Sequence, residues 1–482
     1  MYTSRYSSIS SLIKCAENSL NDGKVNDALR MVHDFVEKII TEPLCTAQVF
    51  SSPDLDRLCL RIGRLTLNCL DADSTNISED IKRNVTQKTV YIVSRLQSAG
   101  GHSRLIHDFI QNQPHKDHLI LLTRVRGASD AAFFKSRFSS EINVELLSAP
   151  KGDFYARLLW LQSQLVAAKP EHVHLFNSHQ DSVAVSALVP ELCLPVSFYH
   201  HCDHHLSLGV HMSHVRHIDL HPMGYHYCRE KLGIENRYLP MTFDDLGLIS
   251  DEDLKSDALT TATVARSNKV EIPYSVSYID LIPKILKVTG GKHVHIGRLS
   301  LYARLKIRNQ LLKLGINRDR FVYFDWTASV WKSMQEHGVD LYINSFPYGS
   351  GLTLIEVMGA GIPVVMHQHI YSRTLSALEM SYSEAFCWTA PEDLLKHLAN
   401  IDLKTLAHEK HLARAQYEKF HRPEILKTFL SDYDSTLSIV PPPMRKVFYY
   451  HYDEWGALME SQVRFSKLLY RLAYRSWLKI RS

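Results

Sequence analysis

The stretch from Asp340 to Met366, DLYINSFPYGSGLTLIEVMGAGIPVVM, decides the fold of this chain. Its pattern of apolar residues predicts a buried strand over 340–344 and a second one over 364–366. Between them lie a glycine-rich turn over 347–351 and a helix over about 352–359. A strand, a turn, a helix and another strand in this order form a βαβ unit of a parallel sheet.

The glycine-rich turn and the helix behind it predict a binding site. Glycines in a turn that opens a helix let backbone N–H groups approach an anion, typically a phosphate. Glu356 lies one turn into the helix, where a carboxylate can accept hydrogen bonds from a vicinal diol such as ribose. A diphosphate at the turn and a ribose at the acid describe a nucleotide-sugar site. The alternative is an ordinary βαβ unit whose glycines only make tight turns.

The segment resembles the donor-binding region of glycosyltransferases with two Rossmann-like domains, known as the GT-B fold. It is most similar to the O-GlcNAc transferase / SPINDLY-like family and related bacterial glycosyltransferases. The resemblance implies that Ser350, Gly351 and Thr353 lie on the turn that meets the diphosphate and that Glu356 binds ribose. Leu352 departs from the family pattern, which usually has a hydroxyl there.

Two further segments resemble the donor site of this family. In the first, Ala265–Glu271, the resemblance implies that Lys269 contacts the donor diphosphate, with Arg266 nearby. A cation over the turn would neutralise the charge that builds on the leaving nucleoside diphosphate, which is the work a metal would otherwise do. The alternative for Lys269 is a solvated surface pair. The second segment, 371–374, contains Arg373 and is expected to lie near the donor.

Length and composition indicate an ordinary globular protein with room for two large domains and a smaller piece. The chain has 482 residues, of which 45% are apolar and 22% are charged. A net charge of +4 is too small to indicate a nucleic-acid partner. The sequence shows neither a secretory leader nor an apolar run long enough to span a membrane, so it predicts a cytoplasmic protein. Eight cysteines without a CxxC pair favour reduced, mostly buried thiols.

Four sections are predicted along the chain. They are a helical N-terminal segment (1–85), a Rossmann-like domain on the acceptor side (86–245), a Rossmann-like domain on the donor side (246–440), and a basic amphipathic helix (441–482). Apolar runs alternate with helical stretches in both large sections, which predicts two doubly wound α/β domains facing a cleft. Strands are expected at 89–93, 118–123, 143–147, 172–176 and 196–199, and at 260–265, 292–296, 321–324, 341–344 and 363–366.

The two terminal sections carry weaker signals. Small and apolar residues between Ala16 and Phe35 have the spacing of one tetratricopeptide-type helix pair, although a plain helical hairpin is the preferred interpretation. The tail is basic and aromatic from about Phe448 onward. It is expected to pack back onto the first domain, and its charge also permits contact with the inner face of an anionic membrane.

Histidines concentrate in the first α/β section, where twelve of the 27 fall between 172 and 226. The run 200–205, HHCDHH, could ligate zinc, but it matches no standard zinc signature. Bacterial GT-B enzymes have similar histidine-rich loops, which implies that the run 200–205 lies at the mouth of the cleft. In those enzymes such a loop is preceded by another that residues 178–181 resemble. A carboxylate there can orient an imidazole that deprotonates an acceptor hydroxyl. Asp203 and His201 are the candidates for base or orienter, and His102 is a competing base.

The resemblance implies a transferase that needs no metal and no cofactor beyond its nucleotide-sugar donor. Retaining GT-B enzymes usually carry a Glu-x7-Glu pair, and Tyr348 stands where the first acid would be, which favours inversion. The predicted function is transfer of a hexosyl or N-acetylhexosaminyl group, most simply from a UDP-sugar, to a hydroxyl or amide of a protein or glycan acceptor. A nucleotide-sugar 2-epimerase and a non-catalytic GT-B subunit that partners another glycosyltransferase remain alternatives.

Overall fold

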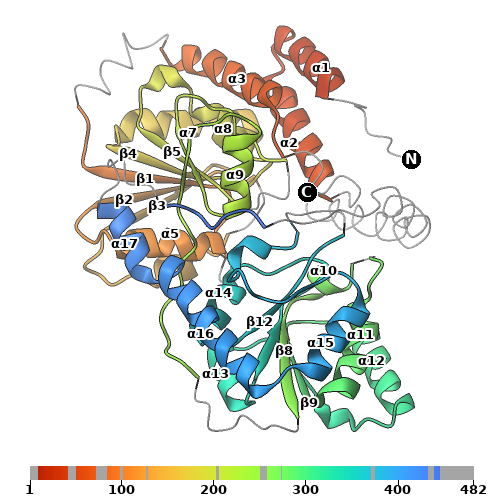
Figure 1. Cartoon of the computed structure of the whole chain (residues 1–482). Coiled ribbons are helices and arrows are strands. Elements are labelled where there is room, and N and C mark those ends of the chain that lie inside the picture. The colour runs from red at the N-terminus through yellow and green to blue at the C-terminus, as the bar shows by residue number, and fades with distance from the viewer. Residues whose placement is uncertain are drawn as a thin grey trace. The chain divides into compact units, whose positions relative to one another are not determined.

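The computed structural model describes residues 9–41, 50–71, 84–97, 101–125, 127, 129–201, 206–249, 258–272, 274–370, 375–431 and 439–445 (Figure 1). The chain divides into two compact units. The first takes in the described residues up to Pro240 together with Leu426–Pro441. The second takes in those from Met241 to Ile425 and from Pro442 onward.

The first unit contains a seven-stranded sheet in the order β3-β2-β1-β4-β5-β6-β7. Every neighbouring pair in it is parallel. Its strands are β1 (Lys88–Val93), β2 (Asp117–Leu122), β3 (Val144–Ser148), β4 (His172–Phe176), β5 (Val196–His200), β6 (Arg216–Asp219) and β7 (Asn236–Tyr238). The order reverses between β1 and β4, which is the switch point where doubly wound sheets bind ligands.

Helices cover both faces of this sheet. One face carries Val90, Ile92 and Val173, which pack in a core shared with α7, α8 and the three N-terminal helices. The N-terminal helices therefore form an outer layer over α7 and α8 (Figure 1). The helices of the unit are α1 (Ile9–Asn21), α2 (Val25–Thr41), α3 (Pro53–Asp71), α5 (Gly101–Gln111), α6 (Ala131–Lys135), α7 (Phe154–Ala168), α8 (Ser182–Ala187), η1 (Pro190–Leu192) and α9 (Pro222–Glu230).

The second unit contains a six-stranded parallel sheet in the order β10-β9-β8-β11-β12-β13. Its strands are β8 (Leu259–Val264), β9 (Gly290–Ile296), β10 (Phe321–Phe324), β11 (Leu341–Ile343), β12 (Val364–His367) and β13 (Cys387–Trp388). The order reverses between β8 and β11, so this sheet also has its switch point at two central strands.

Two separate cores lie on the faces of the second sheet. Alternate strand residues such as Tyr342 and Val364 pack with α13, α14 and α16 on one face. Leu341, Ile343 and Val365 pack with α11, α12 and α15 on the other face. The helices are α10 (Ser267–Val270), α11 (Tyr278–Thr289), α12 (Leu301–Lys313), η2 (Arg318–Arg320), α13 (Val330–Glu336), α14 (Leu352–Gly359), η3 (Leu378–Met380), α15 (Pro391–Asn400), α16 (Leu403–Phe420) and α17 (Pro423–Ser431).

All ten strands predicted from the sequence are present, each within two residues of the predicted bounds. Three short strands, β6, β7 and β13, were not predicted. The sequence of β6 is RHID, which is too polar for a hydropathy pattern to predict a buried strand. In the structure, its His217 and Asp219 are nevertheless buried. β13 has only two residues, too few for a hydropathy period. The N-terminal helix pair predicted between Ala16 and Phe35 is present as α1 and α2.

The stretch 244–249 is bound to the second unit: Arg414 pairs with Asp245 at 2.6 Å and the Trp331 indole donates to Gly247 O at 2.9 Å. The expectation of mostly buried thiols was wrong. Of the six described cysteines, Cys59 and Cys228 are buried, while Cys15, Cys69 and Cys193 are exposed. Apolar neighbours in sequence did not predict burial, because on a helix they can lie on the opposite face.

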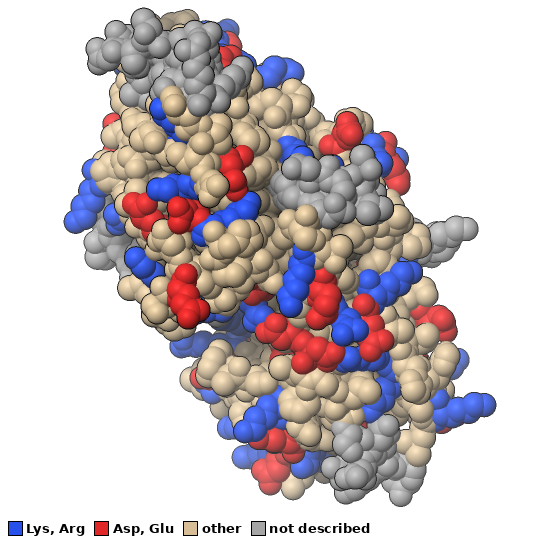
Figure 2. Space-filling view, turned by 90° about the vertical axis from the view of Figure 1, so that its left-hand side faces the viewer, with Lys and Arg blue, Asp and Glu red and all other residues tan. Residues whose placement is uncertain are grey.

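The described surface is mixed in charge. On the face shown in Figure 2, Lys and Arg side chains alternate with Asp and Glu, and its described residues form no extended basic field. None of the described helices is both long enough and apolar enough to cross a membrane. The basic tail from Phe448 lies outside the described residues.

A buried histidine of the second unit is expected to make its stability depend on pH. In the neutral ring of His295 on β9, Nδ1 accepts from the Tyr278 hydroxyl at 2.6 Å while Nε2 donates to Gly297 O at 3.1 Å. Burial lowers the pKa of His295 to about 4. Because the unfolded pKa is about 6.5, the stability this ring contributes is complete above pH 6.5 and is lost as the pH falls toward 4.

We therefore expect the free energy of unfolding to fall less steeply with acid in His295→Gln. The difference in slope should approach about 1.4 kcal/mol per pH unit between pH 6.5 and 4.5. Urea unfolding at a series of pH values measures it. His408→Gln, which changes an exposed histidine of the same unit, is the control and should keep the wild-type slope. Equal slopes in all three proteins would contradict the assignment.

Candidate functional site

The predicted donor residues gather at the switch point of the second sheet. Arg266 and Lys269 follow β8, and the glycine turn 347–351 follows β11, the neighbouring strand. The carboxyl ends of adjacent parallel strands meet at one edge of a sheet, so segments that are far apart in sequence meet there. This is the position at which doubly wound sheets bind nucleotides.

Lys269 contacts the glycine turn directly. Its Nζ donates to the carbonyl oxygen of Gly349 at 3.0 Å, and the Tyr348 N–H faces the Lys269 carbonyl at 3.4 Å. The side chain is partly buried, whereas Arg266, the residue before α10, is exposed. The structure therefore places a cationic group at the turn that opens α14, and its contact with a donor diphosphate stays a prediction.

The turn is held by close backbone packing. The Gly349 N–H donates to Leu375 O at 2.7 Å, and a Cβ on Gly349 would lie 2.8 Å from Ser376 O. Real Cβ atoms do not approach a carbonyl so closely, so only glycine fits at 349. At Gly351 a Cβ would lie 3.1 Å from the Met241 Cε. The segment at 375–376 therefore sits directly against the turn.

Asn344, which the sequence analysis did not single out, holds the glycine turn in place through hydrogen bonds to Ser350. This buried residue follows β11, and its Oδ1 accepts from the Ser350 N–H at 3.2 Å and from the Ser350 hydroxyl at 2.7 Å. Tyr342 places its hydroxyl 3.1 Å from the same Ser350 oxygen. Ser350 is thus buried and serves the turn itself, and a direct phosphate contact from it stays a prediction. An asparagine at a strand end beside glycines was the available signal.

Glu356 and Thr353 lie on α14, behind the turn. Glu356 is partly buried, and its Oε1 accepts from the Trp331 N–H at the start of α13 at 3.0 Å. That bond fixes the carboxylate at the start of α13. Thr353 is partly buried in the first turn of α14. Arg373, the remaining predicted donor residue, lies outside the described residues.

In the first unit, three histidines meet at the carboxyl ends of central strands. His102 is on α5 after β1, His179 follows β4 and His201 follows β5. The ring centroids of His102 and His201 are 3.3 Å apart, and those of His179 and His201 are 5.3 Å apart. The structure therefore brings two of the predicted base candidates together. Asp203, the third, lies outside the described residues.

The tautomer of His201 follows from its partner. Its Nδ1 lies 3.1 Å from the carbonyl oxygen of Tyr199. A carbonyl can only accept, so Nδ1 carries the hydrogen, and in the neutral ring Nε2 holds the lone pair. Burial, together with the neighbouring His102 and His179, keeps the pKa of His201 well below its usual range.

The acid of the predicted 178–181 loop has a structural role in the first unit. Asp181 is buried, caps α8 through the Ala184 N–H at 2.8 Å, and accepts from the hydroxyls of Ser94 and Thr123. Burial raises its pKa, although these donors act in the opposite direction. The carboxylate thereby joins the segments that follow β1, β2 and β4.

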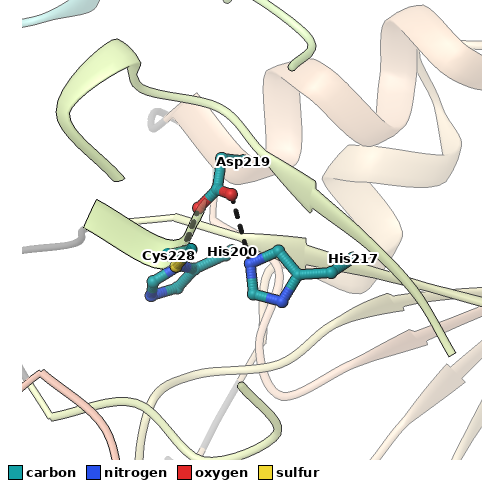
Figure 3. Close-up of side chains that lie close together, drawn as sticks. All are labelled: His200, His217, Asp219 and Cys228. Carbon is teal, nitrogen blue, oxygen red and sulfur yellow. Dashed lines mark hydrogen bonds and ion pairs between the residues drawn. The ribbon is translucent and has the colours of Figure 1, made fainter. Parts of the chain in front are cut away.

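A second group of titratable side chains lies next to His201. His200, the last residue of β5, meets His217 and Asp219 of β6 and Cys228 of α9 (Figure 3). Sequence reasoning considered zinc only for the contiguous run 200–205 and expected no metal. The structure instead groups His200 with three residues further along the chain, and residues 202–205 lie outside the described part.

Two parallel doubly wound sheets, each carrying its candidate residues at the carboxyl ends of central strands, define the GT-B fold. The predicted fold class is therefore confirmed. No protein-family model matches the chain, and no curated protein matches its sequence.

Solved structures of glycosyltransferases share this fold. The lipopolysaccharide outer core galactosyltransferase WaaB matches with a TM-score of 0.56 and 18% identity, over 73% of this chain and 100% of that chain. Anabaena HepE, in complex with UDP-glucose, matches with a TM-score of 0.53 and 15% identity, over 72% of this chain and 100% of that chain. A variant of the Thermobaculum terrenum O-GlcNAc transferase matches with a TM-score of 0.50 and 12% identity, over 94% of this chain and 85% of that chain.

Proposed function

We propose that this protein is a glycosyltransferase that moves a hexosyl or N-acetylhexosaminyl group from a nucleotide sugar to an acceptor on a protein or glycan. The observation that carries the proposal is the bond from Lys269 to Gly349 at the switch point of a GT-B fold. A cation, a glycine turn and the start of α14 converge there. This is the chemistry that a diphosphate requires.

The proposal assigns donor binding to the second unit. The diphosphate would lie at the turn, where Lys269 and the N-terminal end of α14 supply positive charge. Glu356 would accept hydrogen bonds from the ribose hydroxyls. When the glycosidic bond breaks, negative charge builds on the leaving nucleoside diphosphate, and Lys269 would stabilise that charge. A UDP-sugar is the simplest donor, because HepE of the same fold was solved with UDP-glucose.

Acceptor deprotonation is assigned to the histidines of the first unit. His201 holds an Nε2 lone pair, because its Nδ1 hydrogen is committed to the Tyr199 carbonyl. A base of this kind could accept the proton of an acceptor hydroxyl or amide as the sugar is transferred. His102 and Asp203 remain the other candidates. Tyr348 at the position of a retaining enzyme's first acid favours a single in-line displacement with inversion.

Isothermal titration of UDP, GDP, TDP and CMP, with and without EDTA, tests the donor site. We expect one diphosphate to bind tightly and EDTA not to weaken it. Glu356→Gln should then raise the dissociation constant about tenfold to a hundredfold, since hydrogen bonds to a charged acceptor contribute about 1.5–3 kcal/mol. The glutamine keeps an oxygen acceptor for the Trp331 N–H, so the loss reports the missing charge rather than a displaced helix.

Glu336→Gln on α13 is the matched control, because this carboxylate is exposed, and it should leave the affinity unchanged. Failure of every nucleotide to bind the folded protein would favour the non-catalytic subunit. Conversion of a UDP-sugar to its 2-epimer without any acceptor would favour the epimerase.

A further inference from the structure

We propose that His200, His217, Asp219 and Cys228 form a closed binding site for a zinc-class divalent metal ion in the first unit. Their ligand atoms all lie within 4.8 Å of one another, and the four side chains point toward a common centre (Figure 3). The site is separate from the donor residues, which belong to the other unit. The inference therefore does not depend on the proposed transferase activity.

The spacing of the donor atoms fits four-coordinate zinc. Tetrahedral bonds of about 2.0–2.3 Å put neighbouring ligand atoms roughly 3.3–3.8 Å apart. Cys228 Sγ lies 3.6 Å from both His200 Nδ1 and Asp219 Oδ1. His217 Nε2 lies 3.3 Å from Asp219 Oδ2, and His200 Nδ1 lies 2.9 Å from Asp219 Oδ1. The remaining pairs of ligand atoms lie within 4.8 Å, so side-chain movements of up to about 1 Å would bring all four to bonding distance.

The cluster is buried, as a structural metal site usually is. His200 and His217 are 2% and 3% exposed, and Asp219 and Cys228 are 0% exposed. Within the described part of the chain, neither ring nitrogen of His217 makes a hydrogen bond. Its Nε2 is only within ion-pair distance of Asp219 Oδ2, at 3.3 Å. A buried imidazole without a good hydrogen bond is costly, and a metal bond to Nε2 would satisfy the atom that faces the carboxylate.

The chemical types of the four ligands indicate the class of metal. Two imidazoles, one thiol and one carboxylate suit zinc and similar borderline-soft divalent ions, whereas magnesium and calcium prefer oxygen ligands. Asn236 of β7 donates to Asp219 Oδ2 at 2.6 Å, which is the kind of supporting bond that orients a ligating carboxylate. A plain network of hydrogen bonds and ion pairs accounts for the contacts of Asp219 with His200 and His217, but among the described residues it leaves the nitrogens of His217 without a well-formed hydrogen bond.

An ion at this place would join three elements of the first unit. It would tie the end of β5 to β6 and to α9, because each of them contributes a ligand. Four protein ligands leave no open position, so the ion would be structural rather than catalytic. His200 directly precedes His201, so the ion would also fix the strand end from which the candidate base projects.

Metal analysis of the purified full-length protein tests the proposal. We expect about one zinc ion per chain after dialysis against buffer without chelator. Cys228→Ser should lower the zinc content at least about tenfold, as loss of a ligating thiolate weakens such sites strongly. Cys202→Ser is the matched control, because Cys202 belongs to the neighbouring histidine-rich run and should be dispensable.

Cobalt substitution gives a second readout that does not depend on how a variant folds. The metal-stripped wild-type protein should bind Co²⁺ and show a thiolate-to-cobalt charge-transfer band with the visible spectrum of a tetrahedral ion. The band should persist in Cys202→Ser and in His408→Gln, an exposed histidine of the other unit. Absence of zinc together with absence of the thiolate band in the wild type would overturn the proposal. Loss of the band in Cys202→Ser with its retention in Cys228→Ser would overturn it too.

Discussion

Lys269→Ala should lower glycosyl transfer at least about a hundredfold while the protein remains folded. Removing one group that stabilises developing charge typically costs a factor of ~10²–10³ in rate. The Lys269 ammonium is bonded to the carbonyl of Gly349, at the turn where the proposed diphosphate would lie. Transfer of labelled sugar from UDP-sugar donors, measured at saturating donor, reports the effect on turnover.

Two further variants show whether a loss of turnover in Lys269→Ala comes from the missing charge or from a disturbed structure. Lys287→Ala removes an exposed lysine from α11 in the same unit and should leave turnover unchanged. Lys269→Arg keeps the charge and should retain a larger share of activity than alanine does. Unchanged turnover in Lys269→Ala would remove the diphosphate role that we assign to this lysine.

The second large effect is expected at Gly63, inside α3. A Cβ there would lie 1.8 Å from the carbonyl oxygen of Ser186 and 2.7 Å from Cγ1 of Val189, so α3 and the α8 region touch at the backbone. The Gly63 carbonyl also accepts from the buried amide of Gln162 on α7 at 2.9 Å. Gly63→Ala should therefore reduce the free energy of unfolding by about 3 kcal/mol or more, since overpacking against rigid atoms is costly.

Urea unfolding followed by circular dichroism measures this loss. Gly152→Ala is the control, because its Cβ would lie at an ordinary 3.5 Å from the Ala156 Cβ. A Gly63→Ala protein as stable as the wild type would show that the N-terminal helices are not packed on the first sheet as described. The prediction thus tests the shared core of helices and sheet.

Local sequence patterns predicted most of the strands and helices of the fold. Continuous apolar runs predicted the central strands of both sheets, because parallel strands are buried on both faces. The same reasoning failed for strands whose buried side chains are polar. β6 holds His217 and Asp219 in the interior. Asp219 is stabilised there by His200 of β5 and Asn236 of β7, and hydropathy does not record such contacts between strands.

The sequence predicted which residues are candidates for donor binding, but it predicted less well which contacts hold them in place. A glycine turn that opens a helix, with Glu356 one turn further, is a local signal with a local physical cause. The sequence offered only a weak signal for the support from Asn344, an asparagine at a strand end, and none for the packing of segment 375–376 on Gly349. Those contacts depend on how loops from separate strands meet at the sheet edge.

The sequence by itself determined two α/β sections, the positions of their main strands along the chain, and a glycine turn with an acid behind it, because each depends on neighbours in the chain. Only the tertiary structure decided which distant residues meet. Lys269 reaches a glycine 80 residues away, and His200 meets a cysteine 28 residues away. The physical reason is that parallel sheets bring the carboxyl ends of sequentially distant strands to one edge, where contacts depend on strand order rather than on local pattern.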